Sequence, residues 1–309
     1  MKATAQDVLT TKIYFMAAFP ALRIPLEEDP SFAKKFEKVN GVVEFRAADD
    51  ENPVACYMVF LTQEMADKSV QGKRYKVYQG EYPGYIDMAD GSKYEPKVVK
   101  MYFKSIQSLL GVFKGDKMTD MLGIMGPLFK NITNGLTLNF LFLMLTLMKT
   151  MPNYEPKDDW DKYLKVKLSL SLITRALSSA NKLGWPTMQE FTIKQPDRTY
   201  QFTVGATVDD KGNEICPRIT ANLRVKNGKS KATSGLAKYP FVLFKFPNPD
   251  GCLQVLNPKN EFVANVENGY VEIIGAGDSY AVAFNTIMTQ CQNMLIPAKF
   301  GGVPIGFEG

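Results

Sequence analysis

The sequence of 309 residues contains no histidine. Histidine is the usual acid–base group near neutral pH, and it completes many nucleophilic triads and many zinc, copper and haem sites. Chemistry that depends on histidine is therefore excluded, and any catalysis would rest on Asp, Glu, Lys, Tyr, Ser or Cys. This absence favours a binding protein, for which we predict no catalytic residue, no metal ligand and no cofactor.

Cysteine is also scarce, and the four cysteines lie far apart with no CxxC pair. They are Cys56, Cys216, Cys252 and Cys291. This spacing predicts neither a disulfide framework nor a zinc site, and it fits a reducing compartment. No signal-type apolar segment follows Met1-Lys2, because Gln6, Asp7 and Lys12 interrupt it.

Long hydrophobic runs and runs of one charge are missing as well. The longest nearly apolar run, Leu136–Met148, is too short to span a bilayer. The 37 basic and 32 acidic residues are scattered, and none of them form a basic arm. We therefore predict a cytoplasmic protein with no nucleic-acid partner and at most transient contact with membranes.

What the sequence does contain is enough apolar residues, 45% of the chain, for a globular core. We place a domain boundary in the polar stretch 153–159, giving domains 1–152 and 153–309. The first domain begins with helices. Strand-like runs follow at Val42–Arg46, Ala55–Thr62, Tyr75–Tyr78 and Tyr85–Met88, and they predict an antiparallel meander. The apolar spacing of Val98–Phe113 then predicts a helix.

The second domain is predicted to repeat this plan. A helix is expected over Trp160–Leu183, from its apolar spacing. Strands are expected at Glu190–Lys194, Tyr200–Val208, Arg218–Val225 and Phe241–Phe246. Local echoes in a common order also favour a duplication, such as Glu81-Tyr82-Pro83 beside Lys238-Tyr239-Pro240.

The chain ends in a strand, a glycine turn and a long one-sided helix, Gly269–Pro297. Gly275-Ala276-Gly277-Asp278 is similar to the anion-hole motif of ribokinase-type sugar kinases, a resemblance that implies Asp278 as general base. The preceding residues depart from that family's Asp-Thr lead-in, and no glycine-rich N-terminal motif is found. A tight turn followed by a helix cap explains the same residues.

The most unusual stretch is Gly115–Phe129, which is apolar and rich in methionine yet broken by Gly123, Gly126 and Pro127. Flexible methionine side chains adapt to ligands of varied shape, and glycines beside a proline could let a lid open. The alternative is that these methionines only fill the core. A further candidate, the Tyr/Asp pair within Glu81–Asp87, could polarise a carbonyl or could simply flank a turn.

The succession of elements resembles the sterol carrier protein-2 family of domains. In the second half, the resemblance is carried by Tyr239–Phe244, Cys252–Leu256, Gly269–Gly275 and Asp278–Leu295. In the first half it is looser. The resemblance implies an α+β fold of two tandem repeats, each a meander sheet covered by helices. It also implies non-catalytic binding or transfer of a fatty acid, acyl-CoA or sterol-like lipid in an apolar tunnel.

We predict lining residues in each half, and two sites, one shared site, or one site beside a structural half all fit the pattern. The predicted lining residues are Phe103, Ile106, Leu110, Phe113, Met121, Met125, Phe129, Phe140, Met144, Phe284, Met288 and Cys291. Two other functions remain open, a ribokinase-like phosphotransferase and a structural or interaction protein. The residue pattern leaves the oligomeric state undetermined.

Overall fold

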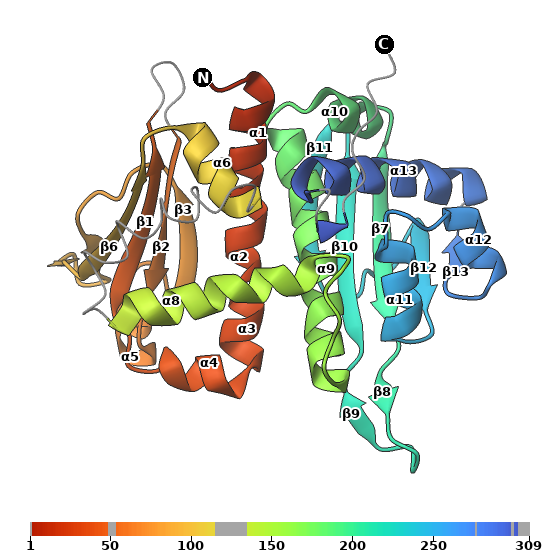
Figure 1. Cartoon of the computed structure of the whole chain (residues 1–309), viewed down its shortest axis with the longest axis horizontal. Coiled ribbons are helices and arrows are strands. Elements are labelled where there is room, and N and C mark those ends of the chain that lie inside the picture. The colour runs from red at the N-terminus through yellow and green to blue at the C-terminus, as the bar shows by residue number, and fades with distance from the viewer. Residues whose placement is uncertain (1, 49–53, 115–134, 276, 298–299, 302–309) are drawn as a thin grey trace. The chain divides into compact units, whose positions relative to one another are not determined.

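A computed structural model describes residues 2–48, 54–114, 135–275, 277–297 and 300–301. The chain divides into two compact units, residues 1–146 (unit 1) and 147–309 (unit 2), each of which is described by itself (Figure 1). The predicted boundary at 152/153 lies six residues beyond the boundary between these units.

Unit 1 opens with a helical segment that continues into two short helices. Its elements are α1 (Ala5–Ile13), the π-helical η1 (Tyr14–Ala18), α2 (Phe19–Ala21), α3 (Arg23–Glu28) and α4 (Pro30–Lys35). Thr4 begins α1 by accepting a hydrogen bond from the Asp7 N–H, and Asp7 in turn accepts one from the Thr4 N–H. Asp29 caps α4, where Pro30 takes the first helical position.

The sheet of unit 1 has four strands in the order β3-β2-β1-β6. They are β1 (Gly41–Ala47), β2 (Val54–Phe60), β3 (Tyr75–Gln79) and β6 (Lys97–Phe103). The other elements of this unit are α5 (Gln63–Lys68), β4 (Ile86–Asp87), β5 (Lys93–Tyr94), α6 (Ile106–Lys114), α8 (Gly135–Leu145) and the 3-10 helix η2 (Thr146–Thr150), which crosses into unit 2.

Two sequence-based expectations change in unit 1. The first three strands form an antiparallel meander as predicted. The predicted fourth strand, Tyr85–Met88, contains only the short β4, which pairs with β5 outside this sheet, and the fourth place is taken by β6, parallel to β1. The helix expected over Val98–Phe113 is instead a strand followed by α6. Alternate residues Val99, Met101 and Phe103 are buried, so the period-two pattern of a sheet prevails over the helical spacing.

Unit 2 contains a five-stranded sheet in the order β11-β10-β7-β12-β13. The strands are β7 (Asp197–Val204), β10 (Ile219–Lys226), β11 (Lys229–Ser234), β12 (Val242–Phe246) and β13 (Glu272–Gly275), with a small hairpin of β8 (Thr207–Val208) and β9 (Glu214–Cys216). The helices are α9 (Asp159–Lys182), α10 (Pro186–Ile193), α11 (Pro249–Leu256), α12 (Phe262–Glu267) and α13 (Asp278–Leu295).

The strand predicted at Glu190–Lys194 is wrong, because these residues fall at the end of α10. Pro186 occupies the first turn of that helix, where its missing N–H is not needed. β11 carries no apolar run that the sequence could signal. It is an edge strand made of KSKATS, held by its pairing with β10.

The first four strands of each unit's main sheet share one topology: β1, β2, β3 and β6 in unit 1, and β7, β10, β11 and β12 in unit 2. In unit 2, as in unit 1, three strands form an antiparallel meander, and the fourth returns to lie parallel to the first. Both parallel ladders end with the same main-chain hydrogen bond, from Ala48 N–H to Phe103 O at 3.1 Å and from Gly205 N–H to Phe246 O at 3.0 Å. The architecture is therefore α+β, with mixed sheets in which antiparallel pairs dominate.

Candidate functional site

Three of the predicted lining residues meet around Phe45, in the core between the sheet and helices of unit 1. The ring of Phe45 lies 6.2 Å from that of Phe103, 6.2 Å from Phe113 and 5.9 Å from Phe140, measured between centroids. These side chains come from β6, α6 and α8 respectively. These three predicted residues therefore lie together with Phe45 in one aromatic cluster.

The remaining predicted residues of unit 1 are less central to this cluster. Ile106 and Leu110 are buried in α6, whereas Met144 in α8 is only half-buried. Three more predicted residues lie outside the described part of the chain. They are Met121, Met125 and Phe129.

The predicted residues of unit 2 also belong to an apolar core. Phe284 in α13 is fully buried and stacks on Tyr200 of β7 at 4.3 Å between ring centroids. Met288 and Cys291 follow it at helical spacing and are buried as well. Burial raises the pKa of the Cys291 thiol to about 12, so this cysteine stays protonated and unreactive near neutral pH.

The structure shows a cavity of about 310 Å³ on another side of unit 1. It is an open pocket bordered by α3, the end of α4, β2, the start of α5 and the residues leading into β3. The lining side chains are Arg23, Leu26, Glu27, Phe36, Phe60, Leu61, Gln63, Gly72, Lys73, Arg74 and Tyr75. Pockets for small organic ligands typically have volumes of about 300–1,000 Å³, so this one suits a small ligand.

The apolar side of this cavity is formed by aromatic rings in contact. Phe60 lies 5.0 Å from Phe36 and 5.0 Å from Tyr75 between centroids. Phe60 is also 6.2 Å from Phe140, which links the cavity wall to the predicted cluster. The Tyr75 hydroxyl donates to the carbonyl of Phe19 at 2.7 Å, which fixes the orientation of its ring.

The polar side of the cavity is cationic. Arg74 donates from its guanidinium to the Phe36 carbonyl at 3.2 Å, while its Nε is buried without a hydrogen-bond partner among the described residues. Lys73 is exposed beside it. Arg23 is neutralised by Glu27, which lies 2.6 Å away at the exposed edge. Neither Arg74 nor Lys73 forms an ion pair within the described residues, so these two side chains supply the net positive charge of the cavity.

Sequence reasoning did not single out the residues that line this cavity. Arg74 and Phe36 are separated by 38 positions, and nothing in their spacing indicates that they meet. A weak signal was present in Gly72-Lys73-Arg74, two basic residues after a turn glycine and before a strand. Such a run is usually solvated, and only the fold places it against aromatic side chains.

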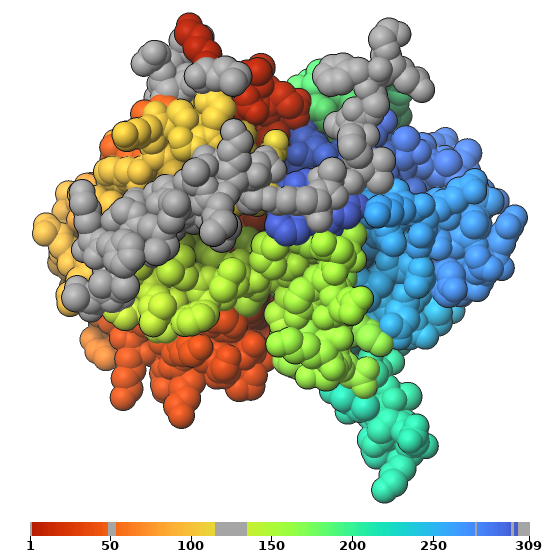
Figure 2. Space-filling model, in the orientation of Figure 1, coloured from red at the N-terminus to blue at the C-terminus, as the bar shows by residue number. Residues whose placement is uncertain are grey.

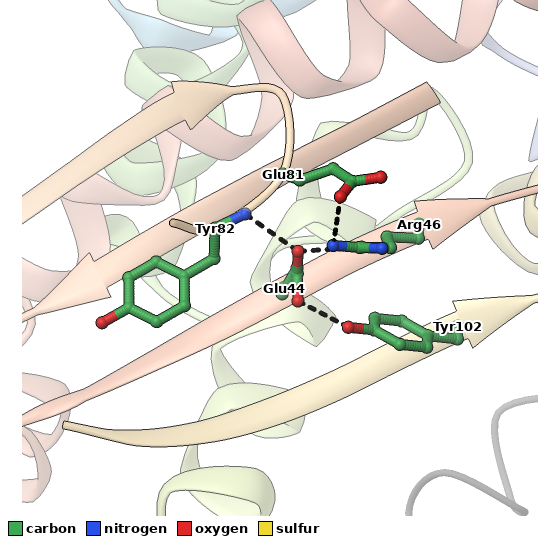
Figure 3. Close-up of polar contacts among 5 residues, drawn as sticks. All are labelled: Glu44, Arg46, Glu81, Tyr82 and Tyr102. Carbon is green, nitrogen blue, oxygen red and sulfur yellow. Dashed lines mark hydrogen bonds and ion pairs between the residues drawn. The ribbon is translucent and has the colours of Figure 1, made fainter. Parts of the chain in front are cut away.

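A second polar cluster lies on the opposite face of the same sheet (Figure 3). Glu44 of β1 is only 2% exposed and accepts three hydrogen bonds: from Arg46 Nε at 2.9 Å, the Tyr82 N–H at 2.9 Å and the Tyr102 hydroxyl at 2.7 Å. Arg46 also contacts Glu81, at 2.6 Å. The cluster attaches the segment after β3 to the sheet.

Hydrogen bonding determines the charge of this cluster. Burial acts to raise the pKa of Glu44, but the hydrogen bonds from Tyr82, Tyr102 and Arg46 outweigh it, and the pKa is lowered. Burial and the hydrogen bond to Glu44 raise the pKa of Tyr102 to about 12. At neutral pH the cluster therefore holds an ionised carboxylate that accepts from neutral tyrosine. The segment Glu81–Asp87, in which the sequence suggested a carbonyl-polarising Tyr/Asp pair, contributes Glu81 and the Tyr82 N–H to these contacts.

The glycine turn before α13 has a steric explanation in unit 2. Gly275 and Gly277 both have positive φ, 114° and 67°, a region in which residues with a Cβ are strained. A Cβ on Gly275 would also collide with the carbonyl of Phe241. Asp278 is exposed at the first position of α13, and β13 runs antiparallel to β12. Ala276 lies outside the described residues.

In the described part of the chain, the Cys, Asp and Glu side chains form no group of three or more arranged to hold a metal ion. Within the same residues, no helix has the length and apolar character needed to cross a bilayer.

Comparisons with known proteins give little information. No family model matches the chain, and no curated protein matches it. Among solved structures, it is similar to a stereoselective inverting sec-alkylsulfatase from Pseudomonas sp., with 13% identity and a TM-score of 0.20. That match covers 56% of this chain and 31% of the sulfatase chain. A TM-score this low carries no argument about fold or activity.

Proposed function

We propose that unit 1 binds, without chemical conversion, a small hydrophobic molecule that carries an anionic head group, such as a fatty acid. The observation that carries this proposal is the cavity of about 310 Å³, whose lining combines the aromatic side chains of Phe36, Phe60 and Tyr75 with the basic side chains of Lys73 and Arg74. The apolar tail would contact Phe36, Phe60 and Tyr75, and the head group would accept hydrogen bonds from Arg74.

The energetics favour a ligand with both parts. Burying a methylene group contributes about 0.8 kcal/mol, so about ten methylenes correspond to the free energy of a micromolar complex. Loss of translational and rotational freedom opposes this by several kcal/mol. Hydrogen bonds to a charged group contribute about 1.5–3 kcal/mol each, which offsets part of that cost when the ligand carries a carboxylate.

We further infer that the two units are related repeats of the sterol carrier protein-2 type. The support is the strand topology that both sheets share, together with the residue pattern from which the resemblance was first drawn. In such a pair, the units need not share one activity. The described cavity with a cationic side belongs to unit 1, and the proposal assigns ligand binding there.

The test is displacement of a dansyl-labelled fatty acid from the full chain by dodecanoic acid and, in parallel, by dodecanol. We expect the acid to displace the probe at micromolar concentration and the alcohol to be about tenfold weaker or worse. Arg74→Gln should weaken binding of the acid and leave the alcohol unchanged. Arg224→Gln in unit 2 removes the same charge at an exposed pair with Asp197 and serves as the matched control.

A variant that fills the cavity separates binding there from binding elsewhere. Leu26→Trp should reduce affinity for both ligands, and its melting temperature reports whether the fold is retained. Equal affinities in Arg74→Gln and Arg224→Gln would contradict the proposal. Native mass spectrometry that shows a Mg-ATP adduct and no fatty-acid adduct would favour a phosphotransferase using Asp278 instead.

A further inference from the structure

We propose that the surface formed by α8 and the end of α4 docks on an anionic lipid bilayer. This surface, the α4–α8 face, consists of Leu138, Phe142 and Leu145 with Lys34, Lys35 and Lys38. The inference rests on the proposed function for its purpose, delivery or uptake of a lipid-like ligand. None of the side chains of this face lines the cavity.

The exposed side of α8 is as apolar as its buried side. Leu138, Phe142 and Leu145 are 50%, 45% and 60% exposed, and their spacing of four and three residues puts them in one stripe. Phe140 and Leu143, on the other side, are buried in the core of unit 1. A helix on the surface of a globular protein ordinarily has polar residues at the exposed positions, so this stripe requires an explanation.

Basic side chains lie beside the stripe. The Nζ of Lys35 is 5.2 Å from the centroid of the Phe142 ring, and Asn139 donates to the Lys35 carbonyl at 3.3 Å. Lys34 and Lys38 are exposed in the same segment. Within the described residues, none of these three lysines forms an ion pair. Glu37 lies among them, so the segment 34–38 has a net charge of +2.

This combination favours a bilayer over another occupant. Apolar residues flanked by lysine are typical of helices that lie in a membrane interface, where the lysines attract anionic head groups. At 11 residues, α8 would extend only about 16 Å, which allows it to lie on a bilayer and not to cross it. Figure 2 shows α8 (lime) and α4 (orange) as adjoining parts of the surface of unit 1.

The position of α4 connects this face to the cavity. Phe36, the residue that ends α4, lines the cavity, and Lys34 and Lys35 form the last turn of the same helix. A bilayer seated on the α4–α8 face would therefore lie next to one cavity wall. Docking there would shorten the path of an apolar tail between membrane and protein.

The experiment is flotation of the ligand-free full chain with vesicles of phosphatidylcholine containing phosphatidylserine, compared with phosphatidylcholine alone. We expect the serine-containing vesicles to bind the protein and the neutral vesicles to bind it weakly. Leu138→Asp with Phe142→Asp should lower partitioning by about tenfold or more. Lys34→Gln with Lys35→Gln should lower it about fivefold per lysine, and added salt should weaken binding further.

Matched controls lie in unit 2. Ile193→Asp places the same charge on an apolar side chain that is 72% exposed, and Lys229→Gln with Lys231→Gln removes two exposed lysines. Neither control should change partitioning. If the double aspartate variant does not fold, Leu145→Asp at the end of α8 tests the same stripe.

Three results would overturn the proposal. They are equal binding to both vesicle types, unchanged binding of the α8 variants, and a dimer of the chain that Leu145→Asp dissociates, which would assign the face to a second copy. Failure here is separable from failure of the proposed function. Arg74→Gln should lose fatty-acid affinity and keep vesicle binding, whereas the α8 variants should do the opposite.

Discussion

The strands β1 and β7 occupy the same place in the two sheets, and each buries one polar side chain. The groups that hydrogen-bond to this side chain differ between the two units. Counted back from the hydrogen bond that ends each parallel ladder, Glu44 in β1 and Gln201 in β7 hold the same position. Both point to the sheet face opposite the aromatic core, and both are almost fully buried, at 2% and 1% exposure. Buried polar groups are costly unless they are hydrogen-bonded.

Unit 1 satisfies this position with a charge. The Glu44 carboxylate can only accept, and its donors are the Tyr82 N–H, the Tyr102 hydroxyl and Arg46 (Figure 3). One of these donors is a cation, which a buried carboxylate needs. The stability of this sheet face therefore depends on the protonation state of Glu44.

Unit 2 satisfies the same position without a charge. The Gln201 amide donates to the carbonyls of Phe202, Ala221 and Gly235 at 2.8, 3.1 and 3.2 Å, and its Oε1 accepts from the Ala237 N–H at 2.8 Å. In both units, one oxygen of this side chain thus accepts a main-chain N–H from the segment that leads to the fourth strand. The shared role of this side chain in the two units is to fasten that segment to the sheet, and a charge is not required for it.

The largest expected effect comes from giving unit 2 the charge of unit 1. Gln201→Glu would turn a carboxylate toward three carbonyl oxygens, and among the described residues no cation hydrogen-bonds to this side chain. We expect a loss of about 3 kcal/mol or more in the free energy of unfolding, measured by urea denaturation. Because burial raises the pKa of the introduced carboxylate, the loss should grow as pH rises. A change below about 1 kcal/mol would mean that the position tolerates charge.

The reverse exchange should cost less. Glu44→Gln keeps an oxygen for the Tyr82 N–H but turns an amide N–H toward other donors, and we expect a loss of about 2 kcal/mol. Hydrogen exchange of residues 41–47 and 78–84 should localise the loss to this face. Glu81→Gln, at a carboxylate whose side chain is 63% exposed, is the control and should change stability by about 0.5 kcal/mol or less. Equal losses in both variants would show that burial does not distinguish them.

A smaller effect is expected from removing one donor. Tyr102→Phe deletes the hydrogen bond to Glu44, and because this tyrosine is 42% exposed we expect a loss of only about 1 kcal/mol. Tyr239→Phe in unit 2, at a side chain that is 81% exposed, should leave stability unchanged. Thermal melting of the two variants beside the parent chain makes the comparison, and matching shifts would contradict it.

The smallest effect concerns pH. The folded pKa of Glu44 lies below its unfolded value, so its contribution to stability is present above a pH of about 4.3 and is lost as pH falls through the folded pKa. The parent chain should therefore lose more stability on acidification than Glu44→Gln, in which this group cannot titrate. Urea denaturation at a series of pH values measures the difference, and parallel curves would exclude Glu44 as its source.

The sequence alone determined the fold class and many of the elements, because those depend on local patterns. Apolar spacing indicated α9 and α13, and runs of β-branched or aromatic residues indicated β1 and β12, since one face of each is buried. The glycines at 275 and 277 indicated a turn. The helix predicted from the sequence at Val98–Phe113 was wrong. The apolar residues there fit both helical and alternating spacing, and pairing with β1 makes the first part of this stretch the strand β6.

Only the tertiary structure decided which polar side chains become buried and which line the cavity. Arg74 meets Phe36 across 38 positions, and Glu44 becomes buried because Tyr82 and Tyr102 fold over it from segments 38 and 58 positions away. In the sequence, Glu44 and Arg46 alternate with Val43 and Phe45, a pattern typical of a strand whose polar side faces water. Burial depends on what covers a side chain, and that contact is made by distant parts of the chain.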